Sequence, residues 1–345
     1  MDELKLTPLN DRLGRDRNVE YTDFAGHSVP AHYGDPTAEY AVLAEGAALV
    51  DRSYKTVLQL SGRDPLGMLD AILTNETPKD EATGAYAALL NPKGRIQTDL
   101  RILKSGEFIL LDTEPEGAET ARETLGRYAP FSRVEVEDLS RGDAPWGILG
   151  LYGPRAGELL DNLQLAEHES AQVEVGGVNV LATGVAVPIP GFDVLGPADA
   201  LYAAREYLIQ AGAKATGHDA YETARVAAGI PRFGSDITSE NFPAEAGILD
   251  RAVSFTKGCY PGQETVARMR YRGHPNRTLH RLLLEGPLPA PDIPITQNGK
   301  QVGRITSIAP LPVDGRNLAL GYLSRNADRE SPLHARDALV SPFPE

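Results

Sequence analysis

Cysteine is almost absent from this sequence, because Cys259 is the only thiol among 345 residues. A single cysteine excludes an internal disulfide framework and agrees with a reducing cytoplasm, where we expect the protein to reside. It also excludes a self-contained iron–sulfur cluster site, since such clusters usually take about four thiolate ligands. If Cys259 touches a metal, it must share the metal with another chain or hold it transiently.

Long apolar runs and the familiar metal and nucleotide motifs are missing as well. No run approaches the ~20 apolar residues that a membrane span needs, so we expect no membrane association. The first residues, Met-Asp-Glu-Leu-Lys, lack the basic and then apolar pattern of a signal peptide. The seven histidines form no HExxH motif, and Cys-x-x-Cys, Walker A and GxGxxG motifs are also lacking. We therefore expect no resident metal site and no nucleotide-binding loop of these kinds.

Positive charge is scarce, since 48 acidic residues outnumber 34 basic ones and leave a net charge of −14. This balance argues against nucleic-acid binding by the surface as a whole. A local basic cluster is nevertheless present. It is either a solvated face with carboxylate partners or a docking place for an anion, such as a polyglutamate tail or RNA phosphate. Direct nucleic-acid contact, if any, is expected to be weak and to use the first three of these residues: Arg268, Arg270, Arg272, His274, Arg277, His280 and Arg281.

What the sequence does contain predicts an α+β protein of two or three domains. Proline opens several apolar stretches with helical spacing, beginning near Pro36, Pro65, Pro154 and Pro197. Strand-like runs lie between them without a strict parallel repeat, at 57–60, 96–103, 108–111, 173–183 and 253–256. The last ~70 residues appear as strands only, because Asn-Gly at 298–299 separates two alternating runs in the manner of a type I′ hairpin.

The segment around the thiol predicts a turn followed by a helix. Proline and glycine at 261–262 favour a tight turn, and residues 263–272 have helical composition with a glycine stop behind them. This places Cys259 just before a helix N-terminus and two residues from Lys257, and both features favour a thiolate. The segment therefore indicates a reactive or ligating cysteine, while the alternative is a small buried hydrophobic residue.

The same segment resembles a known family. Residues 257–264 read K-G-C-Y-P-G-Q-E, which is similar to the K-G-C-[YF]-x-G-Q-E signature of the YgfZ family. Those are folate-binding proteins implicated in iron–sulfur cluster assembly and maintenance. Besides Lys257 and Cys259, the residues that carry the match are Gly258, Tyr260, Gly262, Gln263 and Glu264.

The rest of the chain resembles the wider superfamily of the glycine-cleavage aminomethyltransferase, or T-protein. Five segments carry this resemblance, at 24–33, 50–53, 91–100, 149–156 and 224–231. It implies a T-protein-like folate-binding fold of two α+β domains plus a small C-terminal β-barrel. The expected boundaries are 20–274 for the folate-binding region, with an inner subdomain at roughly 51–137, and 275–345 for the barrel. The implied cofactor is tetrahydrofolate or a derivative.

Folate binding by such a fold implies particular residues. A carboxylate accepts the parallel N–H donors of a pterin edge, and Asp193 and Asp99 are the candidates; Asp99 faces N5 or N10 in an alternative arrangement. Arg225 pairs either with the folate carboxylate or with an internal acid. Tyr86 and Phe192 are candidates for stacking on the pterin, although most aromatic residues simply belong to a core.

The resemblance implies an accessory protein that binds folate and serves iron–sulfur cluster assembly or repair. Its partners would be iron–sulfur enzymes, including those that modify tRNA, or assembly proteins, and its chemically active residues Cys259, Lys257 and Asp99. The alternative is a folate-dependent one-carbon transferase of the aminomethyltransferase kind. Two departures disfavour glycine cleavage: the paired aspartates of the transferase are Thr98 and Asp99 here, and its G-Y-T-G-E-D-G-F-E stretch retains little more than Gly-Phe-Asp at 191–193.

Overall fold

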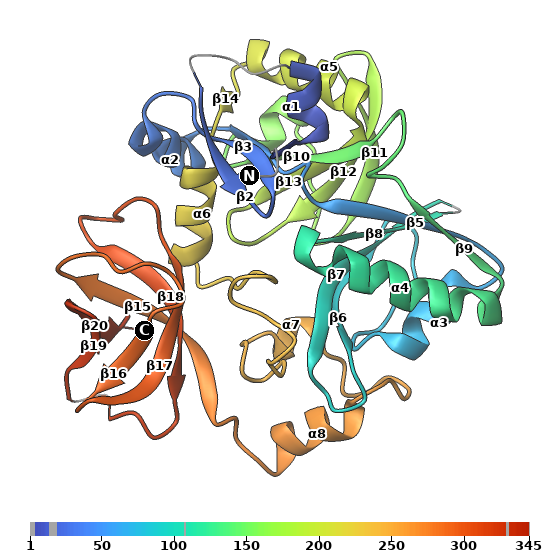
Figure 1. Ribbon diagram of the computed structural model, residues 1–345. Helices are drawn as coiled ribbons and strands as arrows, with labels where there is room; N and C mark the ends of the chain where they lie inside the picture. Colours follow the sequence, from blue (N-terminus) through green and yellow to red (C-terminus); the bar gives the residue numbers. More distant parts are fainter. Residues whose placement is uncertain (1–3, 14–18, 107, 329–330, 345) are drawn as a thin grey trace.

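The computed structural model describes residues 4–13, 19–106, 108–328 and 331–344. Figure 1 shows two parts in which helices accompany a sheet, with a separate barrel formed by the C-terminal residues. This arrangement confirms the α+β class and the C-terminal β-barrel. Within the described ranges, none of the helices is both long enough and apolar enough to cross a bilayer.

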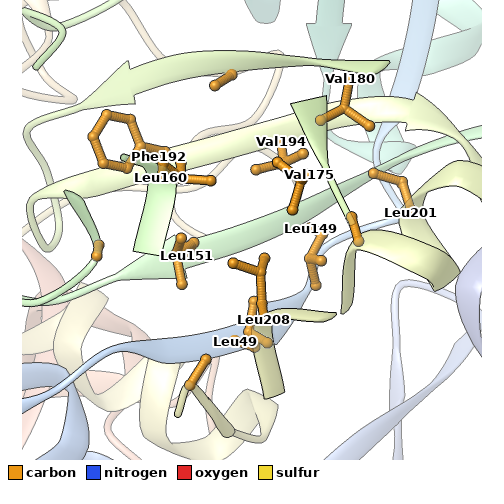
Figure 2. Close-up of a cluster of buried hydrophobic side chains, with 14 of the residues drawn as sticks. Leu49, Leu149, Leu151, Leu160, Val175, Val180, Phe192, Val194, Leu201 and Leu208 are labelled. Atoms are coloured by element: carbon orange, nitrogen blue, oxygen red, sulfur yellow. The ribbon is translucent and has the colours of Figure 1, made fainter. Parts of the chain in front are cut away.

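A six-stranded sheet forms the centre of the first part. Its order is β11-β12-β13-β10-β4-β14, and β14 runs parallel to β4 while the other pairs are antiparallel. Figure 2 shows the apolar face of this sheet, where Leu149, Val194 and Leu201 meet in one buried cluster. The elements are β4 (Ala48–Asp51), β10 (Trp146–Tyr152), β11 (Ser170–Val175), β12 (Val178–Val185), β13 (Gly191–Pro197), β14 (Lys214–Ala215), α1 (Pro8–Leu13) and α5 (Ala198–Gln210).

A five-stranded antiparallel sheet forms the centre of the second part, in the order β6-β7-β8-β5-β9. Two helices bury their apolar sides against it, so that Leu69, Ile102 and Leu125 belong to one cluster. The elements are β5 (Thr56–Gly62), β6 (Gly84–Leu90), β7 (Ile96–Ser105), β8 (Phe108–Thr113), β9 (Val134–Asp138), α3 (Pro65–Ile72) and α4 (Pro115–Ser132).

The remaining elements connect these parts with the barrel. A small sheet, β1-β3-β2, lies beside the first part. Helix α6 contacts both its strand β3 and the barrel strand β18 (Asn317–Ser324). Figure 1 shows α7 between the second part and the barrel, with α8 at the lower edge. The elements are β1 (Lys5–Leu6), β2 (Glu20–Phe24), β3 (His27–His32), α2 (Pro36–Glu45), α6 (His218–Ala227), α7 (Leu249–Ala252) and α8 (Gln263–Tyr271).

The C-terminal barrel closes in the order β15-β18-β17-β16-β19-β20. The predicted hairpin is confirmed, since Asn298 (φ 50°) and Gly299 (φ 76°) both take the positive φ that a type I′ turn requires. The proline-rich stretch at 286–294 is mostly a loop on this domain. The strands are β15 (Arg277–Glu285), β16 (Pro294–Gln297), β17 (Lys300–Ile308), β18 (Asn317–Ser324), β19 (Leu333–Ala335) and β20 (Ala338–Pro342).

Local sequence signals account for several helix starts. Asp35 accepts hydrogen bonds from the backbone N–H groups of Thr37 and Ala38, and Asp64 accepts one from Gly67. In both helices a proline follows the capping aspartate, where its missing N–H costs nothing.

Three local predictions are wrong, and each has a backbone reason. The helix expected after Pro154 is only a 3₁₀ turn, η1 (Gly157–Leu160), because the chain turns left-handed at Asp161. Residues 173–183 form parts of two strands, since consecutive glycines at 176 and 177 take positive φ and reverse the chain. Residues 253–256 form no strand, because the side chain of Ser254 binds the backbone N–H groups of Thr256 and Lys257 instead.

The loop that carries the thiol is anchored at both ends. On one side, the Lys257 ammonium donates to the carbonyls of Asp70, Leu73 and Asn75, at 2.7, 2.7 and 2.9 Å. These carbonyls lie at and beyond the C-terminal end of α3, where carbonyls lack helical partners and a cation is favourable. On the other side, the loop packs against the turn at residues 91–94.

Glycine is required where these two turns meet. Gly262 has a φ of 84°, and a Cβ atom there would lie 2.7 Å from the Asn91 carbonyl oxygen and 2.7 Å from the Cα of Gly94. Backbone atoms cannot move aside as a flexible side chain can. The glycine of the K-G-C-Y-P-G-Q-E segment is therefore required both for the positive φ of the turn and for its close packing against residues 91–94.

We expect Gly262→Ala to destabilise the protein more than Gly247→Ala. Both glycines have positive φ, but nothing lies within 4 Å of a Cβ at Gly247. Alanine in the left-handed region costs about 1–2 kcal/mol, and overpacking at Gly262 should add about 1–3 kcal/mol. Chemical denaturation of both variants measures the difference, and equal losses of unfolding free energy would show that the contact carries no cost.

Candidate functional site

A cavity of about 890 Å³, including its part open to solvent, lies between the two sheets and the segment from α6 to α7. Its walls combine charged groups with aromatic and apolar ones, as small-molecule sites usually do. Representative residues from each wall are Tyr54, Tyr86, Asp99, His168, Tyr221 and Phe233.

Asp99 contributes a buried carboxylate to this cavity from strand β7. The hydroxyl of Tyr86, on the neighbouring strand β6, donates to its Oδ2 at 2.6 Å. Burial raises the pKa of Asp99 to about 6; the Tyr86 hydrogen bond opposes this shift, Glu114 adds to it, and Lys55 opposes it. The cavity thus contains a carboxyl group whose pKa is raised by burial to about 6.

An ion pair crosses the rim above Tyr86. Arg251, in α7, donates to Glu167 Oε1 at 2.7 Å, and its guanidinium carbon lies 5.4 Å from the centroid of the Tyr86 ring. Glu167 belongs to the loop before β11, so the pair joins the first part to α7. The next residue, His168, has a pKa lowered to about 4 by burial and by the charge of Arg101, and its imidazole is therefore neutral at physiological pH.

Asp193 is fully buried and bonded to the protein's own cations. Its Oδ2 lies 3.1 Å from Arg52 Nη1 and 2.6 Å from Arg101 Nη2, and Tyr152 donates its hydroxyl to Oδ1. Burial pushes the pKa of Asp193 up, but Arg52 and Arg101 hold it below its ordinary value. Both arginines line the cavity. Asp193 therefore positions the wall without being a lining residue itself, whereas Asp99 lines the cavity.

The charge network continues into the second part. Arg101 Nε donates to Asp112 at 2.6 Å, and the Lys55 ammonium lies 2.5 Å from the other oxygen of that carboxylate and 3.5 Å from Glu114. Although burial opposes it, the charges of Arg101 and Lys55 hold the pKa of Asp112 well below its usual range. One wall of the cavity is consequently a lattice of paired charges, and Asp99 stands apart from those pairs.

Arg225 pairs with internal acids and Phe192 belongs to a hydrophobic core, which are the alternatives to folate contact that the sequence left open. Arg225 lines the cavity, but its guanidinium binds Glu222 in the same helix, Asp236 at 2.7 Å and the hydroxyl of Ser307 in the barrel. Phe192 is 6% exposed and lies beside Leu160 in the core of the first part (Figure 2). Their proposed contacts with folate find no support in these positions.

Cys259 is exposed, so the alternative of a buried hydrophobic thiol is wrong. It lies in the loop before α8, four positions ahead of Gln263, and the residues described as lining the cavity do not include it. Lys257 turns its ammonium to α3, as described above, and not to the thiol. Among the described residues, no three His, Cys, Asp or Glu side chains gather as a metal site.

Tyr260 links the thiol loop to the cavity. Its side chain is 7% exposed and packs in one cluster with Phe233 and Ile248, which line the cavity, and with Tyr86 at its edge. The cysteine segment and the cavity therefore share a hydrophobic support, although the thiol itself faces solvent elsewhere.

Several cavity residues carry no sequence signal of their own. Arg52, Lys55, Arg101 and Arg251 lie in ordinary strand, loop or helix contexts, and their pairing partners are distant in the chain. Arg52 alone falls inside one of the resembling segments, at 50–53. A charged residue within an apolar strand is a signal that would have singled out Asp112, because β8 is otherwise mostly apolar.

Comparisons with known proteins agree with this architecture. Residues 11–257 match the family described as GCVT N-terminal domain, and residues 276–345 match the CAF17 C-terminal beta-barrel domain. The chain is 28% identical over 340 residues to an aminomethyltransferase of Moorella thermoacetica, covering 94% of this chain and 91% of that protein. It is also 28% identical over 365 residues to an aminomethyltransferase of Thermus thermophilus, covering 99% of each.

A solved structure shows the same fold. The crystal structure of glycine cleavage system aminomethyltransferase T from Bartonella henselae superposes with a TM-score of 0.85 at 20% identity, covering 99% of this chain and 97% of that one. Because the first family spans most of the sequence and the barrel match covers the C-terminal residues, the chain belongs to the GCVT N-terminal domain family and carries a CAF17-type C-terminal β-barrel.

Proposed function

We propose that this protein binds a reduced folate, with the pterin ring beside Asp99 and Tyr86 in the cavity. The observation that carries the proposal is Asp99: a buried carboxylate that faces a cavity and stands outside the network of paired charges. An ionised carboxylate accepts two parallel N–H donors of a pterin edge, and burial strengthens such bonds. Membership of the family supports the same ligand, as the resemblance to the T-protein implies.

The walls of the cavity suit the rest of such a ligand. Tyr54, Tyr86, Tyr221 and Phe233 supply aromatic surface, and aromatic side chains stack favourably on flat rings. Arg251 lies on the same lining and meets a carboxylate of the folate tail in this proposal. Its side chain is 35% exposed, so its ion pair with Glu167 is easily exchanged, whereas the Arg225 side chain is 5% exposed and bonded to Glu222 and Asp236.

The role we propose for the bound folate is support of iron–sulfur cluster assembly or repair. The K-G-C-Y-P-G-Q-E segment supports it, because this segment resembles the YgfZ signature and displays an exposed thiol on a firmly anchored loop. Its partners would be iron–sulfur enzymes, including those that modify tRNA, or their assembly proteins.

A second candidate is folate-dependent one-carbon transfer of the aminomethyltransferase kind. The shared fold and the names of the relatives favour it. The two departures from the transferase sequence, Thr98 in place of the first paired aspartate and the altered stretch that ends at 191–193, disfavour it. Glycine cleavage by the purified protein together with its carrier protein would establish this activity.

Direct contact with RNA has less support. Two of the three arginines proposed for it are paired with carboxylates on the surface, Arg268 with Glu264 at 2.8 Å and Arg270 with Asp250 at 3.0 Å. This is the arrangement of a solvated charged face, although exposed pairs of this kind are weak and easily exchanged.

We expect Asp99→Asn to abolish most folate binding while stabilising the protein at alkaline pH. The pKa of Asp99 is raised to about 6 from 3.8, so the folded state loses stability as pH rises through this window. Asparagine removes that cost and still accepts from Tyr86. Titration calorimetry with tetrahydrofolate should show affinity at least about tenfold weaker, and thermal unfolding should show a gain at pH 8 that shrinks toward pH 5.

The wild-type protein should bind tetrahydrofolate more weakly as pH falls below about 6, and Asp99→Asn should lose this dependence. Asp143→Asn, at an exposed position, serves as the matched control and should behave as wild type. Unchanged folate affinity in Asp99→Asn would remove Asp99 from the site.

Replacement of Cys259 separates the thiol from the folate site. Cys259→Ala and Cys259→Ser should leave folate affinity and unfolding temperature unchanged, because the side chain is exposed and lies outside the cavity lining. In cells that lack the wild-type gene, we expect both variants to fail to restore the activity of an iron–sulfur enzyme. Full restoration by either variant would exclude the thiol from the mechanism.

A further inference from the structure

A second hollow lies on the outer surface of the barrel, and its lining shares no residue with that of the first cavity. It measures about 740 Å³, including its open part, and spans three neighbouring strands, β15, β18 and β17. The strand register pairs Arg277 with Ser324 and Arg304 with Tyr322. Ser324 and Tyr322 are two residues apart and so share a face of β18, which places one guanidinium on each side of that strand.

The two guanidinium groups are only loosely satisfied by the protein. Arg277 Nε lies 3.5 Å from Glu245 and its Nη2 donates to the Glu240 carbonyl at 3.3 Å, while Arg304 Nη1 lies 3.6 Å from Asp292. Charge-assisted bonds are usually 2.7–2.9 Å long. Each arginine side chain is about one-third exposed, at 35% and 36%. Donors of both groups therefore remain available to a ligand.

The floor of this hollow is rigid. Tyr322 is 2% exposed, and its hydroxyl donates to the Asp236 carbonyl at 2.9 Å. The guanidinium carbon of Arg277 lies 5.2 Å from the centroid of the Tyr322 ring, close enough for a cation–π contact. Arg277 is thus held over a fixed ring, so that a ligand would not have to order a free surface side chain.

The lining contains donors and, among the described residues, no carboxylate. Gln301 and Ser324 add an amide and a hydroxyl to the two arginines. A hollow lined by positive and hydrogen-bond-donating groups favours an anionic ligand, and it stands out in a chain whose net charge is −14. We propose that the hollow is a binding site for a phosphoryl group. A phosphoryl group carries up to two charges and three acceptor oxygens, and it can satisfy two guanidinium forks and a hydroxyl together, whereas a single carboxylate has two oxygens.

Titration with inorganic phosphate, adenosine monophosphate and succinate tests the proposal, in a phosphate-free buffer at about 50 mM salt, where screening is modest. We expect saturable binding of both phosphorylated probes, and Arg304→Gln should weaken it about tenfold or more. Arg316→Gln, at an exposed position on the same barrel, is the charge-matched control and should bind as wild type. Arg277→Gln should match Arg304→Gln, and the latter remains informative if the former unfolds.

Each possible result of these titrations either supports or overturns the phosphoryl site. Tighter binding of the nucleotide than of phosphate would support a phosphorylated metabolite as the ligand, and equal binding would support free phosphate; both sustain the site. Absence of saturable binding, or an equal loss in Arg304→Gln and Arg316→Gln, would overturn it. Succinate binding as tightly as phosphate would overturn the choice of a phosphoryl group. None of these results depends on folate binding in the first cavity.

Discussion

Arg101 holds the two sheets together by pairing with a buried carboxylate in each. It extends from β7 to Asp112 in its own sheet and to Asp193 in the other, and neither carboxylate has exposed surface. Removing an ion from water costs several kcal/mol, and only close pairing offsets this cost. The two sheets must therefore meet in the one orientation that brings Arg52, Arg101 and Lys55 to these acids, and the cavity is the space that this orientation leaves.

Asp99, whose pKa is raised by burial, lies on the same strand as Arg101. It lies two residues before Arg101, so both side chains point to the same face of β7. Arg101 is neutralised by two acids, whereas Asp99 receives a neutral hydroxyl from Tyr86. A buried carboxylate that is left without a bonded cation costs stability and is a common mark of a functional position. The cations thus position the wall, and Asp99 is a lining carboxylate for which the described residues provide no ion pair.

Asp236 plays the corresponding part between the α/β region and the barrel. Its carboxylate accepts from Arg225 in α6 and from Thr306 and Ser307 in β17, and its carbonyl accepts from Tyr322 in β18. Arg225 lines the cavity between the two sheets and Tyr322 lines the barrel hollow. One buried acid therefore binds a lining residue of each hollow and helps to fix the barrel.

Local chemistry in the sequence determined the helix caps at Asp35 and Asp64, the Asn298-Gly299 hairpin and the α+β class, because each depends on residues close together in the chain. The closed barrel was expected only from the resemblance to the T-protein, since its first and last strands are far apart in the chain. The resemblance at 257–264 located the thiol loop. Only the tertiary structure decided that Asp193 faces cations while Asp99 faces the cavity, that Lys257 serves the end of α3, and that Arg277 and Arg304 flank one strand. These contacts join residues that are dozens to more than a hundred positions apart in the chain. The free energy of a buried charged group depends on which oppositely charged group lies beside it, and only the folded chain decides that.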